Sequence, residues 1–254
     1  MKVVILAGGR GTRLSEETHS IPKPMVAIGG RPILWHIMRH YASYGFQDFV
    51  VALGYKGYVI KEYFVNYLSH MSDLSVDLGS GGIEVLSRHR EDWKVTLVDT
   101  GQSTMTGGRL SKLSPMLTEP FLLTYGDGLS DLSIDDLVAY HRGRAVLATV
   151  TAVHPAPRFG ALAIKDGMVS RFREKPTDSQ DRINGGFFVM EPEVLSLING
   201  DDCVLEAGPL ATLASRHQLA AFEHDGFWMP MDTLRDRDEL HRLWQTGDAP
   251  WVRV

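Results

Sequence analysis

The sequence predicts an α/β fold built on a Rossmann-like, open, mixed but mostly parallel sheet. Three observations support this prediction. Short, unbroken apolar runs of strand length recur over residues 1–155, as in strands that are buried on both faces. Segments with helical spacing of apolar residues separate several of these runs, which favours parallel strands joined by crossover helices. Two later runs joined by Asp166-Gly167 predict a small antiparallel, β-rich insertion instead.

The N-terminal part begins with a predicted βαβ unit. Residues 3–7 form a branched apolar run closed by glycines, and they predict a first buried strand. Apolar residues at helical spacing predict a helix over 33–42, and the run 49–53 predicts a second strand. A further amphipathic stretch places five apolar residues on one helical face: Ile60, Tyr63, Phe64, Tyr67 and Leu68.

The remaining elements follow the same logic. A turn-rich segment at 78–82 precedes a predicted strand over 94–98. Beyond it, the sequence predicts strands over 121–125, 145–153, 161–164, 168–172 and 183–190, and helices over 134–142 and 233–247. Because no repeat, low-complexity tract or linker-like run interrupts them, we expect one continuous domain over residues 1–254.

Composition and charge exclude several classes of protein function. The chain holds 26 Lys and Arg against 31 Asp and Glu, a formal net charge of −5, which is too acidic for a protein whose main partner is a nucleic-acid backbone. The single cysteine, Cys203, allows no internal disulfide and no cysteine-based zinc site. The run 3–7 is far too short for a signal peptide or a membrane span. We therefore expect a cytoplasmic protein without a nucleic-acid or membrane partner.

A glycine-rich turn after the first predicted strand is the strongest local motif. It reads Leu6-Ala7-Gly8-Gly9-Arg10-Gly11-Thr12-Arg13-Leu14, and Pro22-Lys23-Pro24 follows it. Such glycines bring backbone N–H groups close to a phosphate, and Arg13 and Lys23 can neutralise its charge. The glycine spacing fits neither a dinucleotide-binding motif nor a P-loop. The turn predicts an anion-binding cradle, with a tight turn and solvated basic residues as the structural alternative.

Two carboxylates are candidate ligands for Mg²⁺. Asp127 follows an apolar strand between two glycines, at the strand end where open α/β sheets bind ligands. Mg²⁺ is usually held by one or two carboxylates together with substrate phosphates, and Asp232 is the candidate for the second. A turn residue at Asp127 and a helix N-cap at Asp232 are the structural alternatives.

Two later segments carry groups that suit a sugar phosphate. Glu174-Lys175-Pro176 follows a predicted strand, and Asn184-Gly185-Gly186 lies in the next one. A lysine next to proline and an amide beside glycines can bind a phosphate and hydroxyl groups, although each segment alone also fits a solvated turn. The ten histidines show neither metal-ligand spacing nor a serine-hydrolase pattern.

Taken together, these motifs resemble the sugar-1-phosphate nucleotidyltransferase family. The general family features are Leu6-Ala7-Gly8-Gly9-x-Gly11-Thr12-Arg13-Leu14, Pro22-Lys23-Pro24, Gly126-Asp127, Glu174-Lys175-Pro176 and the late Asp232. A narrower resemblance, to cytidylyltransferases of this family, rests on residues 15–18, 104–110, 158–162, 183–189 and 230–236. The resemblance covers residues 1–251 and implies a glycosyltransferase-A-like nucleotidyltransferase fold. Residues 1–155 would then bind the nucleotide, and residues 156–254 would bind the sugar and carry the C-terminal helix.

The resemblance also implies individual roles. The nucleotide site would comprise Leu6, Ala7, Gly8, Gly9, Gly11, Thr12, Arg13, Lys23, Thr104, Arg109 and Gly126. The sugar-phosphate site would comprise Glu174, Lys175, Asn184 and Gly185. Asp127 and Asp232 would hold Mg²⁺, and Arg13, Lys23 and Asp127 would act in catalysis.

The narrower resemblance implies a reaction and leaves alternatives open. The reaction would transfer a cytidylyl group from CTP to α-D-glucose 1-phosphate, and the resemblance suggests a homo-oligomer. One stretch departs from the pattern: similar cytidylyltransferases read Trp-Glu-Gln-Glu-Pro-Leu where residues 205–210 read Leu-Glu-Ala-Gly-Pro-Leu, so Gly208 lacks a carboxylate. The alternatives are the same fold acting on dTTP, UTP or another sugar or polyol phosphate, and a regulatory protein that binds nucleotide without turnover.

Overall fold

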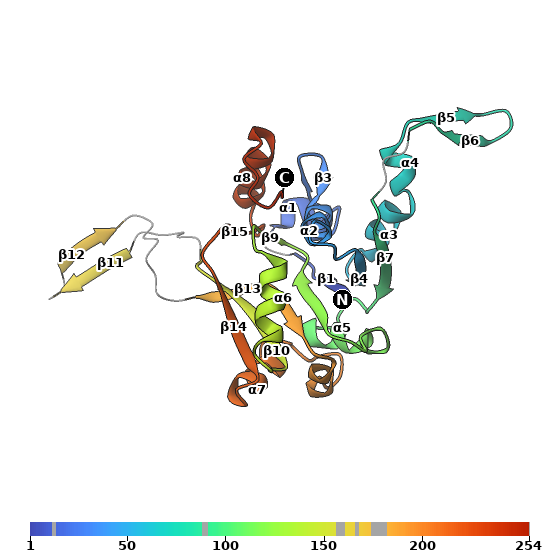
Figure 1. Ribbon diagram of the computed structural model, residues 1–254. Helices are drawn as coiled ribbons and strands as arrows, with labels where there is room; N and C mark the ends of the chain where they lie inside the picture. The colour runs from blue at the N-terminus through green and yellow to red at the C-terminus, as the bar shows by residue number, and fades with distance from the viewer. Residues whose placement is uncertain (12–13, 88–90, 156–160, 166–167, 174–181, 254) are drawn as a thin grey trace.

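A seven-stranded sheet forms the centre of the molecule (Figure 1). Its strands are, in spatial order, β14 (Leu219–His224), β10 (Ala148–Val153), β13 (Ile183–Met190), β8 (Phe121–Tyr125), β1 (Val3–Ala7), β4 (Asp48–Leu53) and β7 (Lys94–Asp99). β13 runs antiparallel to β8 and β10, whereas the remaining neighbours run parallel. The predicted open, mixed and mostly parallel sheet is confirmed. The computed structural model describes residues 1–11, 14–87, 91–155, 161–165, 168–173 and 182–253.

The helices are short and pack mostly against the sheet. They are α1 (Ser15–Thr18), α2 (Ile33–Ala42), α3 (Gly57–Val65), α4 (Tyr67–Met71), α5 (Thr106–Lys112), α6 (Ile134–Arg142), α7 (Pro209–Ser215) and α8 (Leu234–Thr246). The 3₁₀ turns η2 (Lys23–Met25), η3 (Ser114–Met116) and η4 (Pro192–Leu197) accompany them. The sequence predicts α2, α6 and α8 within one or two residues but gives no signal for α5 or α7, since each has only seven residues.

Pairs of short strands complete the described part of the fold. They are β2 (Ala27–Ile28) with β3 (Arg31–Pro32), β5 (Leu74–Asp77) with β6 (Gly82–Val85), β9 (Gly128–Ser130) with β15 (Trp228–Pro230), and β11 (Ala161–Lys165) with β12 (Met168–Arg173). β11 and β12 form the predicted antiparallel hairpin. The β9–β15 pair is the one that builds the site described below.

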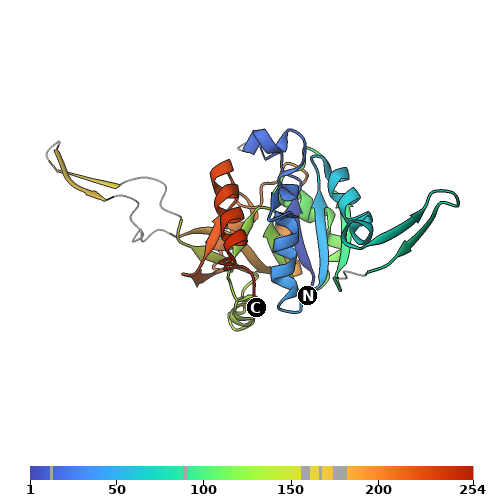
Figure 2. The ribbon, with the colours of Figure 1, turned by 90° about the horizontal axis from the view of Figure 1, so that it is seen from above.

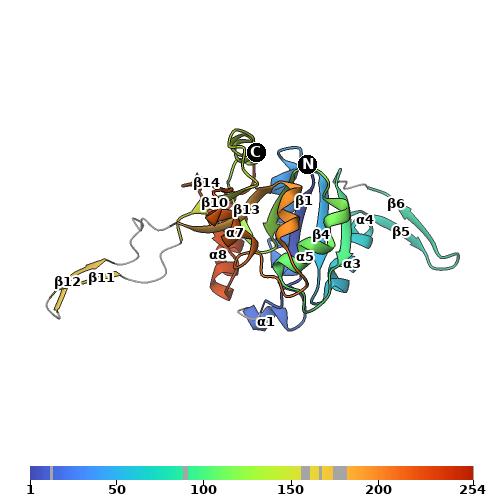
Figure 3. The ribbon, with the colours of Figure 1, turned by 90° about the horizontal axis from the view of Figure 1, so that it is seen from below.

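The core has two layers, one on each face of the sheet. Alternate residues of β1 point to opposite faces, as a strand requires: Val3 and Ile5 join the layer under α2 and α8, and Val4 and Leu6 join the layer under α5 and α7. Figures 2 and 3, seen from above and from below, show these helices against the sheet. Burial of β1 on both faces explains why its sequence is apolar without alternation.

The segment after β4 meets the sequence-based expectations only in part. The predicted common face of Ile60, Tyr63, Phe64, Tyr67 and Leu68 forms only in part. The rings of Tyr63, Phe64 and Tyr67 contact one another, but the helix breaks between α3 and α4 at Asn66 (φ −95°, ψ 7°). Ile60 is fully buried, but Leu68 is 55% exposed. The turn-rich segment at 78–82 is the tip of the β5–β6 hairpin, which projects from the body on the side of β7 (Figures 1 and 2).

None of the helices in the described ranges combines the length and the apolar character that a membrane crossing would require.

Candidate active site

A cavity of about 560 Å³ opens at the carboxyl ends of β1 and β8. The N-terminal end of the antiparallel β13 reaches the same edge, so residues from both halves of the chain line the cavity. This edge is where open α/β sheets place their ligands, and the volume lies within the range of small-molecule sites.

The cavity gathers the site residues that the sequence predicts. Those that line it are Leu6, Ala7, Gly8, Gly9, Gly11, Lys23, Thr104, Arg109, Gly126, Asp127, Asn184, Gly185 and Asp232. The other four, Thr12, Arg13, Glu174 and Lys175, lie outside the described residues. Residues separated by more than 200 positions therefore share one wall, although their individual roles stay predictions.

Lys23 lies between the two candidate metal ligands. Its Nζ is 2.6 Å from Asp127 Oδ2 and 2.8 Å from Asp232 Oδ1. Lys23 and Asp232 are buried, with 7% and 8% of their surfaces exposed, while Asp127 is half-buried. The ammonium group is a positive charge that both carboxylates already share, so a small cation placed near this point would contact both.

Local packing brings these three residues together. The ring of Pro24 lies against Gly126, where a Cβ would be 3.0 Å from Pro24 Cγ, and this contact sets Lys23 beside Asp127. The β9–β15 pairing returns the chain antiparallel to residues 128–130. The Met231 N–H then donates to the Asp127 carbonyl over 2.8 Å, and Asp232 follows directly.

The N-cap of α8 is Thr233, not Asp232. The Thr233 hydroxyl accepts from the Asp236 N–H, and the Asp236 carboxylate accepts from the Thr233 N–H, which together form a capping box. The alternative interpretation of Asp232 as a helix N-cap is therefore wrong. Its carboxylate faces Lys23 and the cavity instead.

The carboxylate pair fits Mg²⁺ better than a metal held by protein ligands alone. Within the described ranges, no three His, Cys, Asp or Glu side chains gather closely enough to hold a metal ion. Mg²⁺ does not need such a cage, because it usually takes one or two carboxylates and completes its coordination with phosphate oxygens and water. Asp127 and Asp232 supply that minimum.

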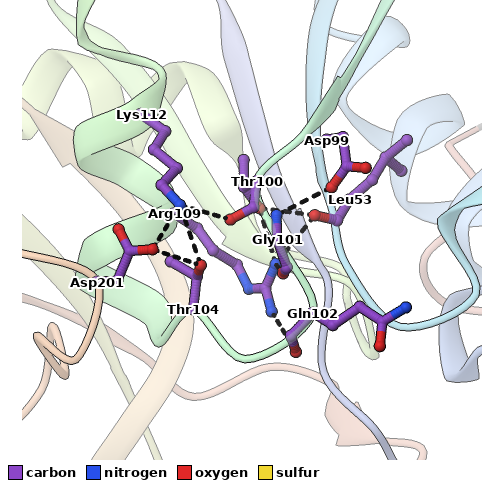
Figure 4. Close-up of polar contacts among 9 residues, drawn as sticks. All are labelled: Leu53, Asp99, Thr100, Gly101, Gln102, Thr104, Arg109, Lys112 and Asp201. Carbon is purple, nitrogen blue, oxygen red and sulfur yellow. Dashed lines mark hydrogen bonds and ion pairs between the residues drawn. The ribbon is translucent and has the colours of Figure 1, made fainter.

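Arg109 lines the cavity and donates hydrogen bonds to several segments of the chain; Figure 4 shows its contacts with Leu53 and with residues 100–102. Its Nη1 donates to the carbonyls of Leu53 (2.9 Å) and Gly101 (2.7 Å) and to the Thr100 hydroxyl, and its Nη2 donates to the Gly8 carbonyl (3.1 Å). Burial lowers the pKa of this guanidinium from its ordinary value. A Cβ at Gly8 would lie 2.2 Å from Arg109 Cζ, so only glycine admits this approach. We infer that Arg109 holds the glycine-rich turn in position.

Replacing Arg109 by lysine should therefore destabilise the fold. Lysine keeps the charge but loses the planar fork that reaches three segments at once. We expect a loss of about 2–4 kcal/mol in the free energy of unfolding, measured by denaturant titration. Lys112→Ala on the same helix is the matched control: its ion pair with Asp201 is exposed, so its loss should cost less than about 1 kcal/mol. Equal effects of the two substitutions would contradict this role of Arg109.

Sequence reasoning assigned no site role to several residues of the cavity wall, among them Thr106, Tyr125 and Trp228. Trp228 Nε1 donates to the Gly185 carbonyl over 2.7 Å and so fixes the backbone of β13 at the cavity. Tyr125 is the last residue of β8, directly before Gly126-Asp127. The position of Tyr125 at a strand end could have indicated a site residue, because side chains there face the ligand edge of the sheet.

The departure at Gly208 lies away from the cavity wall. Gly208 precedes α7, and a Cβ there would meet Val204 O at 3.4 Å and Cys203 Sγ at 3.8 Å. The preceding Glu206, which matches the first glutamate of the pattern, instead contacts the wall residues Thr106 and Tyr125.

Comparison with known proteins agrees with the fold. The model of the nucleotidyl transferase family matches residues 2–233. The chain is 55% identical over 253 residues to the glucose-1-phosphate cytidylyltransferases of Salmonella typhimurium and Salmonella typhi, a match that covers 99% of this chain and 98% of each relative. The structure of UDP-glucose pyrophosphorylase from Acinetobacter baumanii covers 97% of this chain and 93% of its own, with a TM-score of 0.69 at 17% identity. The chain belongs to the nucleotidyl transferase family.

Proposed function

We propose that this protein transfers a cytidylyl group from CTP to α-D-glucose 1-phosphate and releases CDP-glucose and pyrophosphate. The observation that carries the proposal is the 55% identity, over nearly the full chain, to two glucose-1-phosphate cytidylyltransferases. The cavity at the carboxyl ends of β1 and β8 supports it, because residues that we assign to the nucleotide, from the first half of the chain, and residues that we assign to the sugar, from the second half, line the same space.

The proposed reaction requires the protein mainly to align the two substrates and to neutralise phosphate charge. An oxygen of the sugar phosphate attacks the α-phosphorus of CTP, the bond to the β-phosphate bridge breaks, and pyrophosphate leaves with that electron pair. The attacking oxygen is already anionic, so the step needs no general base. Catalysis then comes from in-line positioning and from positive charge that compensates the departing pyrophosphate.

Lys23 is the described residue best placed to provide that charge. Its ammonium group is held at the cavity by Asp127 and Asp232, within the stretch of wall that includes the glycine-rich turn. We assign Arg13 a second positive charge on the nucleotide phosphates, and Glu174 and Lys175 contacts to the sugar phosphate, as the family resemblance implies. Residues 1–155 would thus bind the nucleotide, while Asn184 and Gly185 would bind the sugar from the other half.

Asp127 and Asp232 would hold Mg²⁺ together with the substrate phosphates. When bound, the cation neutralises phosphate charge and orients the triphosphate. The role of the protein in this arrangement is to fix both carboxylates, through the Met231 N–H bond to Asp127 and the capping box that follows Asp232.

A substrate matrix tests the proposed reaction. Pyrophosphate release is measured with CTP, UTP, dTTP, ATP and GTP against the 1-phosphates of glucose, mannose and galactose, with and without Mg²⁺. We expect the highest kcat/KM for CTP with glucose 1-phosphate and no turnover without a divalent cation. A preference for dTTP or UTP, or for another sugar phosphate, would replace the proposed substrates, and no turnover with any pair would favour a regulatory nucleotide-binding protein.

We further propose that the protein is a homo-oligomer that uses the β5–β6 hairpin as a contact between copies. Val76, Leu78 and Ile83 on this hairpin are 50%, 91% and 66% exposed. A lone two-stranded hairpin is marginally stable in water, and clustered exposed apolar side chains mark interaction sites. A second copy of the chain would shield them.

Leu78→Glu should consequently shift the protein to a smaller species in light scattering coupled to gel filtration, because a charge in an apolar contact is poorly tolerated. Met116→Glu, an exposed apolar position on η3, is the control and should leave the mass unchanged. A monomeric wild type, or an unchanged mass for the hairpin variant, would contradict the proposal.

A further inference from the structure

Glu206 lies behind the cavity, between two of the residues that line it. Its Oε2 accepts a hydrogen bond from the Thr106 hydroxyl over 2.8 Å, and its Oε1 accepts one from the Tyr125 hydroxyl. The Leu205 N–H donates to the same Thr106 hydroxyl over 2.9 Å. The segment that carries Glu206 is thereby tied both to the start of α5 and to the end of β8.

The hydrogen-bond directions follow from the chemistry of these groups. A carboxylate only accepts, so the Tyr125 hydroxyl must donate its proton to Glu206. The Tyr125 oxygen is then left as an acceptor, and Asn184 Nδ2 donates to it over a long 3.4 Å. Asn184 Oδ1 in turn accepts from the Gly186 N–H over 2.8 Å. These two contacts together allow one orientation of the Asn184 amide.

The Tyr125 ring is held firmly enough to transmit this orientation. It lies against Gly186, where a Cβ would be 2.6 Å from the ring and where φ is +80°, a conformation that favours glycine. The ring also packs edge-on against Phe188, at 6.0 Å between ring centres. Burial, together with the bond to Glu206, raises the pKa of Tyr125, so the hydroxyl stays protonated and remains a donor.

We propose that Glu206 is a positioning residue for the sugar-phosphate subsite, and that it acts through the Tyr125 hydroxyl to fix the orientation of the Asn184 amide. The inference rests on the proposed function, since it assigns a sugar ligand to Asn184. With the amide fixed, Asn184 presents one remaining N–H and one remaining lone pair at the cavity. A sugar hydroxyl both donates and accepts, and it can use both.

Without Glu206 the Tyr125 hydroxyl loses its acceptor. The Tyr125 hydroxyl then competes with the Gly186 N–H for Asn184 Oδ1, so the amide is no longer held in one orientation and the donor and acceptor at the cavity are no longer fixed. The cost should fall on glucose 1-phosphate, whose hydroxyl meets the amide, and much less on CTP. The effect on KM should be about fivefold to tenfold, the usual range for one hydrogen bond in water.

A double-mutant cycle tests this inference. We compare Glu206→Ala, Tyr125→Phe and the double variant by KM for each substrate, by kcat and by thermal unfolding. Each single variant should raise KM for glucose 1-phosphate more than KM for CTP. If Glu206 acts through Tyr125, the second substitution should add less than about a twofold change to the first. Multiplying effects, or equal effects on the two substrates, would overturn the inference.

Two further measurements keep the test decisive. If Glu206→Ala unfolds, Tyr125→Phe alone suffices, because it keeps the ring and its contact with Phe188; an unchanged KM for glucose 1-phosphate would then overturn the inference. If the wild type does not turn over CTP with glucose 1-phosphate, the proposed function fails by itself. Calorimetric binding of glucose 1-phosphate to the same variants would then show whether the coupling exists without that reaction, and additive binding losses would reject it.

Discussion

Asp127→Asn should abolish cytidylyl transfer, with kcat lowered by about two to three orders of magnitude, the usual loss when one preorganised charge partner is removed. The carboxylate has two tasks that an amide cannot perform. It offers an anionic oxygen to Mg²⁺, which favours such hard ligands, and it holds the Lys23 ammonium at 2.6 Å. Asparagine keeps the volume and the turn between Gly126 and Gly128, so the melting temperature should change little.

Pyrophosphate release with saturating CTP and glucose 1-phosphate measures this effect. Asp135→Asn, a matched loss of one exposed carboxylate in the first turn of α6, is the control and should keep wild-type activity. An Asp127→Asn variant with near-wild-type kcat would remove Asp127 from both the metal site and the catalytic group. A large drop in melting temperature would instead assign Asp127 a structural role.

The parts of the fold that sequence predicted well are those buried on both faces of the sheet. All five residues of β1 and four of the five residues of β8 are buried, and such strands must be apolar throughout. β14, at the sheet edge, has no fully buried residue, and its apolar run ends after four residues, at Glu223, so the sequence did not predict this strand. The β5–β6 hairpin is exposed almost throughout, and its glycine-rich tip resembled an ordinary turn.

The sequence identified the types of residue in the candidate site but not which of them lie next to one another. Strand-end positions and glycines single out the turn at residues 6–14 and Asp127, because their local sequence carries the signal. That Asp232 lies opposite Asp127 depends on the three-residue pairing of β9 with β15, which is too short to leave a periodic pattern. Glu206 was missed because its hydrogen-bond partners Tyr125 and Thr106 are 81 and 100 positions away, so no local pattern marks these contacts.

Lys23→Met should have two opposite effects, a large loss of turnover and tighter binding of a divalent cation by the substrate-free protein. Turnover should fall by about two to three orders of magnitude, because a positive charge beside the substrate phosphates is lost. Cation binding should improve because the Lys23 ammonium, at 2.6 Å and 2.8 Å from Asp127 and Asp232, competes for the same carboxylates. Methionine has a similar length and no charge, so it leaves the two carboxylates together without the Lys23 ammonium between them.

Calorimetric titration of the nucleotide-free protein with Mn²⁺ or Mg²⁺ measures the second effect, and it does not depend on turnover. We expect the dissociation constant to fall at least about tenfold, which corresponds to about 1.4 kcal/mol, and the cation to raise the melting temperature of the variant more than that of the wild type. Lys112→Met, which removes an ammonium paired with the exposed Asp201, is the matched control and should change neither quantity. Unchanged or weaker cation binding by Lys23→Met would show that Asp127 and Asp232 do not form a common cation site, because two carboxylates freed from a shared ammonium must otherwise attract a cation more strongly.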